Sequence, residues 1–275
     1  MIRIMFALTF ITNLALGQNK DRLFIYWGYN RSAYTQSDIH LNGPGYDFTL
    51  KNTTASDRPT KFDPSVYFSV KLFTIPQYVY RAGYFITDNI SVSLGIDHLK
   101  YVVDANQSLV LDGTIDSTAS NTYAGTYSNQ EHMLTNDFMR FEHSDGLNYV
   151  SAELDYHWHL ANLGENFSIS GIAGGGIGTY IPKTLVNLFG NRVDNSFHIA
   201  GYGASLHGKI RFYYRNTLFI TTSVKSGWAF LPGVFVDGTD EAFCNHNFGW
   251  IEHYAAFGGQ FYLRKKKAEE HRGVE

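Results

Sequence analysis

Hydrophobic and polar residues alternate along several stretches of this chain. In VSAELDYHWHL, from Val150 to Leu160, the even positions are apolar and the odd positions are polar. Successive side chains of a β-strand point to opposite faces, so this stretch predicts a strand with one wet face and one apolar face. The alternation begins again at Ile90, Ala200, Leu218 and Ile251. Since no stretch carries a sustained helical stripe, the pattern predicts an all-β chain.

Eight segments of this kind are predicted as strands. Their approximate bounds are 22–33, 77–87, 89–104, 147–160, 166–181, 197–214, 217–230 and 248–263. Most exceed the roughly 5 to 6 residues usual in globular proteins and reach the roughly 9 to 11 that a membrane-crossing strand needs. An even number of strands predicts a closed antiparallel transmembrane β-barrel. Recruitment of 45–50 and 66–73 would instead give ten strands.

The connections between these segments are alternately long and short. Those after the second, fourth and sixth segments are short, and the long ones span roughly 34–76, 105–146, 182–196 and 231–247. Outer-membrane barrels have short periplasmic turns and long extracellular loops, so this order predicts that both termini are periplasmic. Asn42-Gly43-Pro44-Gly45 is a turn signal and predicts a hairpin in the first loop.

Aromatic residues gather near the short-turn ends of the predicted strands. They are Tyr84, Phe85, Tyr156, Trp158, Phe212, Tyr214, Phe261 and Tyr262. Aromatic side chains collect where a membrane meets water, so this set predicts a girdle on the periplasmic side of the barrel.

The two ends of the chain differ from the rest. A short start with Arg3, an apolar run to Leu16 and small residues at Ala15 and Gly17 are typical of a secretory signal peptide cleaved before Gln18. The predicted divisions are a signal peptide at 1–17, an outer-membrane barrel at 18–264 and a charged periplasmic tail at 265–275.

The composition favours strands and limits the possible partners. The chain contains 19 Tyr, 21 Phe and 26 Gly, and only 17% of its residues are charged. Aromatic residues favour strands, whereas glycines favour turns and close backbone approach. A net charge of −3 gives no reason to expect nucleic acid as a partner. Cys244 is the single cysteine, which excludes an internal disulfide.

The polar positions of the alternating segments fall inside the predicted barrel. They include four basic residues and four acidic residues, namely Arg81, Lys209, Arg211, Lys225, Asp97, Glu153, Asp155 and Glu252. An eight-stranded barrel is about wide enough for side chains to fill, so we expect these groups to pair as a polar plug. His157 and His159 share this register and complete the predicted lumen network. Alternatively, His-x-His can bind zinc from one face of a strand.

The glycines of GIAGGGIG, from Gly171, superficially fit a phosphate-binding loop. Such a loop lies between a strand and a helix whose N-terminus holds the phosphate. Here the glycines lie inside a predicted strand, beside Ser170 and Thr179, and no helix follows. Close approach of neighbouring side chains, or curvature of the strand, explains them better. We expect no cofactor.

This arrangement resembles the small, eight-stranded bacterial outer-membrane barrels. The resemblance covers about 20–264 and rests on the signal peptide, the alternating strands, the loop asymmetry and a last strand that ends GGQFYLR. In that family the barrel assembly machinery reads a glycine and spaced apolar residues in the last strand. Gly258, Phe261 and Leu263 match this spacing, although a charged tail follows them. The resemblance implies a place in the bacterial outer membrane, in contact with lipid and lipopolysaccharide.

Two barrel enzymes of similar size act on lipid A, and the resemblance therefore raises a catalytic alternative. FEHSDGLN, from Phe141, contains His143, Ser144 and Asp145, the residue types of a hydrolase triad. The deacylase has its histidine and serine two positions apart. His143 and Ser144 are adjacent instead, so a regular strand would point them to opposite faces. We expect this stretch to order a loop, with Asp145-Gly146 forming a turn.

The sequence favours a structural or surface-binding barrel whose loops contact an extracellular ligand of unknown identity. Tyr and Asn in exposed loops make adaptable contacts with partners. Two alternatives stay open. One is a lipid A-modifying acyl hydrolase or transferase, and the other is a narrow channel for small solutes, which ten strands would favour.

Overall fold

A computed structural model describes residues 19–69, 71–72, 75–239 and 241–262. The predicted signal peptide at 1–17, the predicted tail at 265–275 and Leu263 lie outside the described residues. The strands are β1 Arg22–Tyr34, β2 Ser37–Gly43, β3 Tyr46–Thr53, β4 Ala55–Ser56, β5 Tyr78–Phe85, β6 Ile90–Val103, β7 Ser108–Ile115, β8 Gly125–Met133, β9 Met139–Leu163, β10 Phe167–Pro182, β11 Leu185–Leu188, β12 Asn191–Asp194, β13 Gly201–Tyr214, β14 Leu218–Phe235 and β15 Phe243–Tyr262. One short helix, α1, spans Pro64–Tyr67.

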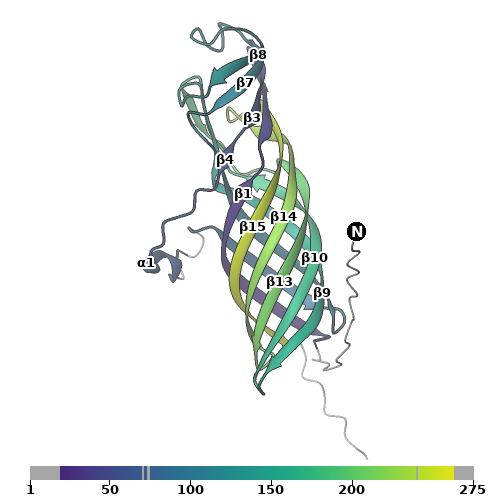
Figure 1. The fold of residues 1–275 in the computed structure, drawn as a ribbon. Coiled ribbons are helices and arrows are strands. Elements are labelled where there is room, and N and C mark those ends of the chain that lie inside the picture. Colours follow the sequence, from purple (N-terminus) through teal and green to yellow (C-terminus); the bar gives the residue numbers. More distant parts are fainter. Residues whose placement is uncertain (1–18, 70, 73–74, 240, 263–275) are drawn as a thin grey trace, which may run out of the picture.

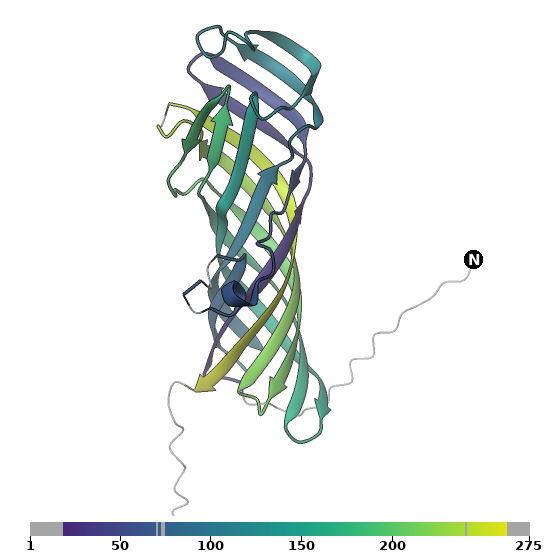
Figure 2. The same ribbon diagram turned by 90° about the vertical axis from the view of Figure 1, so that its left-hand side faces the viewer.

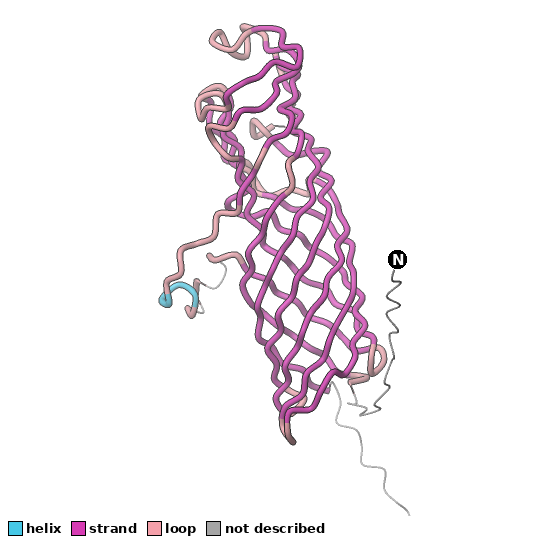
Figure 3. The backbone as a smooth tube through the Cα atoms, in the orientation of Figure 1, coloured by secondary structure: helices cyan, strands magenta, loops and turns pink. Residues whose placement is uncertain are grey.

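Eight strands close into an antiparallel barrel (Figures 1 and 3). Neighbours in the ring follow the order β1, β5, β6, β9, β10, β13, β14 and β15, and β15 pairs with β1 again. Closure lets the backbone of each ring strand pair on both sides, which a strand in lipid requires. The eight-strand prediction is confirmed. The ten-strand alternative is wrong, because β3 lies in a sheet above the ring and Val66 lies in α1.

The outer face of the lower barrel carries a belt of exposed apolar side chains. On β9 the belt runs from Leu154 to Leu163, and on β15 it runs from Ile251 to Tyr262. Such a belt is the lipid-contacting surface of a transmembrane barrel. Within the described residues, no helix is long and apolar enough to span a membrane.

Seven of the eight residues predicted for the periplasmic girdle are on the outer face of the barrel. Tyr84, Tyr156, Trp158, Phe212, Tyr214, Phe261 and Tyr262 are partly or largely exposed on the lower barrel. Phe85 is fully buried instead, and its ring lies 5.5 Å from that of Phe24 inside the lumen. Phe85 is adjacent to Tyr84, so the alternation of strand β5 points it to the opposite face.

Above the belt, the long connections fold into an extracellular lobe (Figures 2 and 3). This lobe consists of β2, β3, β7, β8, β11 and β12 together with the upper ends of the ring strands. β2 pairs with β15, β3 joins β2 to β7, and β8 forms the far edge. The predicted hairpin in the first loop is confirmed as β2–β3, whose turn contains Gly45 at φ +79°. The lobe therefore continues the barrel wall as β-structure.

Candidate functional site

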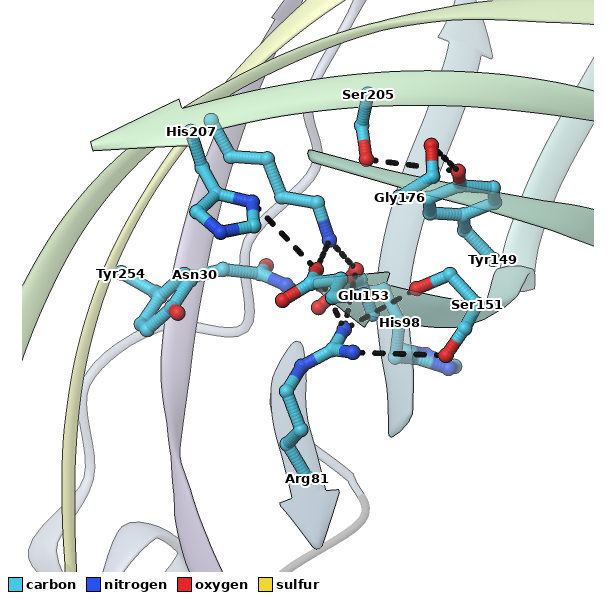
Figure 4. Close-up of polar contacts among 12 residues, drawn as sticks. Asn30, Arg81, His98, Tyr149, Ser151, Glu153, Gly176, Ser205, His207 and Tyr254 are labelled. Carbon is cyan, nitrogen blue, oxygen red and sulfur yellow. Dashed lines mark hydrogen bonds and ion pairs between the residues drawn. The ribbon is translucent and has the colours of Figure 1, made fainter. Parts of the chain in front are cut away.

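The middle of the lumen holds a buried cluster of charged side chains, which we call the charged cluster (Figure 4). Its members come from five ring strands and are Arg81, Asp97, Glu153, Asp155, His207, Lys209 and Lys225. Figure 4 labels Arg81, Glu153 and His207 among them. The inward register of the ring strands brings all of them to one level of the barrel.

Glu153 is the centre of the charged cluster. Its carboxylate lies 3.0 Å from Arg81, 3.1 Å from Lys209 and 2.6 Å from Lys225. Asp97 pairs with Arg81 and Lys225 at the side of Glu153 nearest β6. Each buried charge thus faces an opposite charge, as burial away from water demands.

Asp155 and His207 form the second arm of the charged cluster. Asp155 lies 3.0 Å from the Lys209 ammonium and 2.5 Å from His207 Nε2. His207 was not included in the predicted network, although it is on the inward face of β13 two positions before Lys209. The alternation of β13 was a sufficient signal to find it.

Inward glycines leave the room that the charged cluster occupies. A Cβ added at Gly174 would stand 2.3 Å from Asp155 Oδ1, and one at Gly176 would stand 2.8 Å from Glu153 Cγ. At Gly95 it would meet the Arg81 guanidinium at 2.9 Å. The glycines of GIAGGGIG are therefore explained by close approach of neighbouring side chains, as the sequence suggested.

Two residues of the predicted plug do not join the ion pairs. The Arg211 guanidinium lies 4.0 Å from the ring centre of Phe219 and contacts the rings of Phe24 and Tyr26 as well. Glu252 is fully buried, and its two carboxylate oxygens accept no hydrogen bond within the described residues. The prediction that all eight charges pair is thus wrong for Arg211 and Glu252. Both point inward, but the charged cluster contains neither of them.

The two histidines proposed as zinc ligands occupy different environments. His157 is buried and its Nε2 lies 2.8 Å from Ser91 Oγ, whereas His159 is partly exposed. Within the described residues, the one close group of three possible metal ligands is Glu153, Asp155 and His207, so His157 and His159 are not part of it. Lys209 already donates to the carboxylates of both Glu153 and Asp155. The group is therefore neutralised by the protein's own cations and does not fit a metal.

Apolar side chains fill the lumen above the charged cluster. Tyr149 and Tyr180 stack with ring centres 4.8 Å apart, and Trp250 Nε1 donates to Tyr180 Oη at 2.7 Å. This layer is part of a continuous apolar core, which we call the upper core and which runs on into the lobe and includes Leu99 and Phe248. The upper core joins the inside of the barrel to the inside of the lobe.

A second apolar group fills the lumen below the charged cluster. Phe24, Tyr26, Val79, Phe85, Tyr213, Phe219, Tyr254 and Ala256 form it. Side chains thus fill the lumen at three successive levels, and at two of them the filling is apolar. This arrangement suits a closed barrel better than a water-filled path.

The proposed catalytic residues His143, Ser144 and Asp145 do not form a triad. His143 is buried in the upper core with its Nδ1 2.9 Å from Thr184 Oγ1. Ser144 donates to Glu142, and Asp145 forms an ion pair with Lys183 at the surface. A triad requires a nucleophile within reach of its base, and each of these residues has a different partner.

The expected turn at Asp145-Gly146 is a β-bulge. Strand β9 runs without a break through it, and residues 144–146 stand opposite the single residue Lys100 of β6. Gly146 adopts φ +133°, a conformation that favours glycine. The bulge bends β9 where it passes from the barrel into the lobe.

His143 meets a second histidine inside the upper core. The Nε2 atoms of His143 and His246 lie 3.5 Å apart, and the two rings stack with centres 5.6 Å apart. Both residues lie above the apolar belt, outside the membrane-spanning segments. Burial lowers the pKa of His246 to about 3. Burial, followed by the charges of His246 and His198, holds the pKa of His143 well below its usual range.

We expect acid to destabilise the lobe through this histidine pair. In the unfolded chain the imidazoles bind protons below about pH 6.5, whereas the folded, buried imidazoles stay neutral. Stability is therefore complete above pH 6.5 and falls as the pH drops toward the folded pKa. For His246 alone the loss between about pH 7 and pH 5 is about 2 kcal/mol, to be measured by guanidinium unfolding in vesicles. His246→Phe removes one titrating group, and an unchanged pH dependence in this variant would contradict the assignment.

The outer face of the lobe carries a polar recess of about 310 Å³. Gln36, Ser37, Asp38, Asn52 and Asn247 line it. Asp38 accepts the backbone N–H of Asn52 at 2.9 Å, which joins the start of β2 to the end of β3. Amide groups supply both donors and acceptors, so this recess can bind hydroxyl groups. These residues carry no periodic pattern, and the sequence did not identify them as a group.

Comparison with known proteins gives matches to solved structures alone. No family model matches the chain, and no curated protein matches it. The outer membrane protein OprG from Pseudomonas aeruginosa is similar at 11% identity and a TM-score of 0.43, over 90% of this chain and 99% of that chain.

Two further solved structures are similar at comparable identity. The attachment invasion locus protein Ail of Yersinia pestis matches at 12% identity and a TM-score of 0.32, over 88% of this chain and 99% of that chain. Neisserial surface protein A matches at 8% identity and a TM-score of 0.37, over 87% and 97%. At such low sequence identities and TM-scores, these matches do not indicate what activity the chain has. These three solved structures, which this chain resembles, are small bacterial outer-membrane β-barrel proteins.

Proposed function

We propose that this protein is a closed barrel of the bacterial outer membrane that presents its extracellular lobe to a partner outside the cell. In this proposal, residues 1–17 are removed on export and the barrel assembly machinery inserts the chain. Lipid and lipopolysaccharide then surround the apolar belt. The barrel supplies a rigid base, and the binding function belongs to the lobe.

The observation that carries the proposal is the continuity of the upper core. Leu231 and Val234 of β14 and Cys244 of β15 are fully buried in it, together with Leu41 of β2 and Leu111 of β7. The long connections are thus held by the same kind of packing that holds a globular domain. A loop that only links strands has no need of such packing, whereas a binding surface benefits from being rigid.

The polar recess is the place on the lobe where we propose that the partner binds. Two asparagines, one glutamine and one aspartate offer donors and acceptors at a surface that is open to the outside. Such a group suits a ligand rich in hydroxyl groups, of which cell-surface sugars are an example. Its position beside β15 places it just above the barrel.

Binding to a glycan array tests this proposal. The full chain, embedded in nanodiscs and carrying a fluorescent lipid, is applied to the array as wild type, as Asn247→Ala and as Asn245→Ala. Asn245 is exposed on the same face of β15 but does not line the recess. We expect wild type and Asn245→Ala to bind a common set of sugars that Asn247→Ala loses. Absence of binding by wild type, or equal binding by all three proteins, would contradict the proposal.

The lipid A alternative makes a different prediction. If the bulge residues perform acyl chemistry, the mass of lipid A will differ between cells with the protein and cells that carry His143→Ala. We expect identical mass spectra, because the proposed base, His143, is buried and hydrogen-bonded to Thr184, not to the proposed nucleophile Ser144. An acyl chain gained or lost only with the intact protein would make the chain an enzyme.

A further inference from the structure

A short segment stands outside the barrel wall, below the lobe. It spans residues 57–69, which we call the flank segment, and contains α1 (Figures 1 and 2). Neither the lumen nor the lobe contains it. Its position beside the wall, instead of above it, requires a separate explanation.

The flank segment is attached to the wall through hydrogen bonds with two outward side chains and one backbone N–H of β1. Tyr29 Oη donates to the carbonyl oxygen of Tyr67 at 2.5 Å, and Arg31 Nη2 donates to Tyr67 Oη at 3.1 Å. Ser32 N donates to Asp57 at 3.1 Å, near the start of the segment. These bonds fix the segment against the upper part of β1, where Tyr29 pairs with Ala255 and Ser32 with Glu252 at the upper end of the belt on β15.

A chain of aromatic rings connects the flank segment to the lipid-facing belt. In order it consists of Phe257, Trp27, Tyr29, Tyr67, Phe62 and Phe68, with successive ring centres 4.6–6.4 Å apart. Phe257 is exposed in the belt, and at the other end Phe62 and Phe68 are 68% and 78% exposed. Two phenylalanines this exposed to water would be unfavourable, whereas the same rings in lipid are stable.

The charges near these rings are arranged to favour an anionic surface. Lys61 and Arg31 are exposed and form no ion pair with any carboxylate that the structure describes. Each acid of the segment accepts hydrogen bonds from its neighbours: Asp57 from the N–H of Ser32, and Asp63 from the N–H and hydroxyl of Ser65. Lys61 and Arg31 thus form no ion pair with a carboxylate among the described residues, and Arg31 is held in place by its bonds to the Asn30 carbonyl at 2.6 Å and to Tyr67 Oη.

We propose that the flank segment is an interfacial anchor in the outer leaflet of the membrane. Phe62 and Phe68 enter the upper acyl region, and Lys61 and Arg31 lie at anionic lipid headgroups. Aromatic rings with adjacent cations are typical of segments that lie in a membrane interface. The continuity of the aromatic chain with the belt identifies lipid, not a protein partner, as the occupant. This inference does not rest on the binding role proposed for the lobe.

Fluorescence quenching by labelled lipid tests the position of the flank segment. An environment-sensitive fluorophore is placed on Phe68→Cys, and the full chain is reconstituted in vesicles of phosphatidylcholine and phosphatidylglycerol with nitroxide groups high on the acyl chains. Leu206→Cys in the belt and Gln130→Cys on β8 are the two references. Native Cys244 is buried, so the introduced thiol is the one that labels.

The expected result is that lipid nitroxides quench position 68 at least half as strongly as position 206. Position 130 should be quenched little, and iodide in the water should quench it more than position 68. Quenching at position 68 that equals that at position 130 would overturn the proposal.

A second comparison tests the role of the charges. Lys61→Gln should reduce the quenching at position 68 in vesicles that contain phosphatidylglycerol, because each cation near an anionic surface adds to the attraction. The same change should have no effect in phosphatidylcholine alone. Lys51→Gln, in the lobe, is the matched control. An equal effect in both lipids, or no effect in either, would overturn the assignment of Lys61 to anionic headgroups.

Discussion

Replacing Glu153 with glutamine is expected to lower the free energy of unfolding by about 3–5 kcal/mol. The Glu153 carboxylate lies within ion-pair distance of Arg81, Lys209 and Lys225, and all four side chains are buried. Glutamine keeps the size but removes the charge, so three buried cations would share Asp97 and Asp155. Guanidinium unfolding of the barrel in vesicles measures the loss.

Glu165→Gln is the matched control for this experiment. Glu165 is exposed in the turn between β9 and β10, so removal of its charge should change stability by less than about 0.5 kcal/mol. A loss in Glu153→Gln no larger than the loss in the control would show that the charged cluster does not hold the ring strands together.

Replacing Leu206 with arginine is expected to cost about 2–4 kcal/mol. Leu206 is 73% exposed near the middle of β13, with its side chain on the outer face of the belt. In water an exposed leucine tolerates such a change, whereas in lipid the guanidinium must leave water or drag water with it. The same unfolding measurement in vesicles gives the value.

Met133→Arg separates the effect of lipid from the effect of the substitution. Met133 is 53% exposed on β8, in the lobe and away from the belt. Arginine at this position should therefore be nearly neutral. Equal costs at positions 206 and 133 would mean that the belt does not face lipid.

The ring strands could be predicted from the sequence because their two faces have opposite surroundings. Lipid outside and a polar lumen inside impose strict alternation, which is why the predicted segment 147–160 lies within β9, and 217–230 lies within β14 except for its first residue. The alternation also predicted that Glu153, Asp155, Lys209 and Lys225 share the lumen. Burial of each confirms the register.

The lobe could not be predicted in the same way, because its strands do not separate lipid from a lumen. At the top of β6, successive residues Tyr101, Val102 and Val103 are all buried, since the lobe covers both faces there. Strand β8 shows the opposite, with nearly every side chain exposed. Neither pattern alternates. The top of β6 was still included in the predicted strand 89–104, whereas β8 fell in the predicted loop 105–146.

Which of the inward charged side chains form ion pairs also could not be predicted from the sequence. Alternation tells which side chains point inward, but the height of each one depends on the stagger of the strands around the ring. Arg211 therefore falls among the rings of Phe24, Tyr26 and Phe219, below the charged cluster. Glu252 is opposite Lys225 in the β14–β15 register, yet no ion pair joins them.

Ion conductance across a planar bilayer tests most directly whether the barrel is closed. The purified full chain is inserted at a range of voltages, and its folded state is verified by resistance to protease. Because side chains fill the lumen at three levels, we predict no steady conductance steps from wild type. Steady steps from wild type whose size changes in Lys225→Gln would contradict the account and make this barrel a channel.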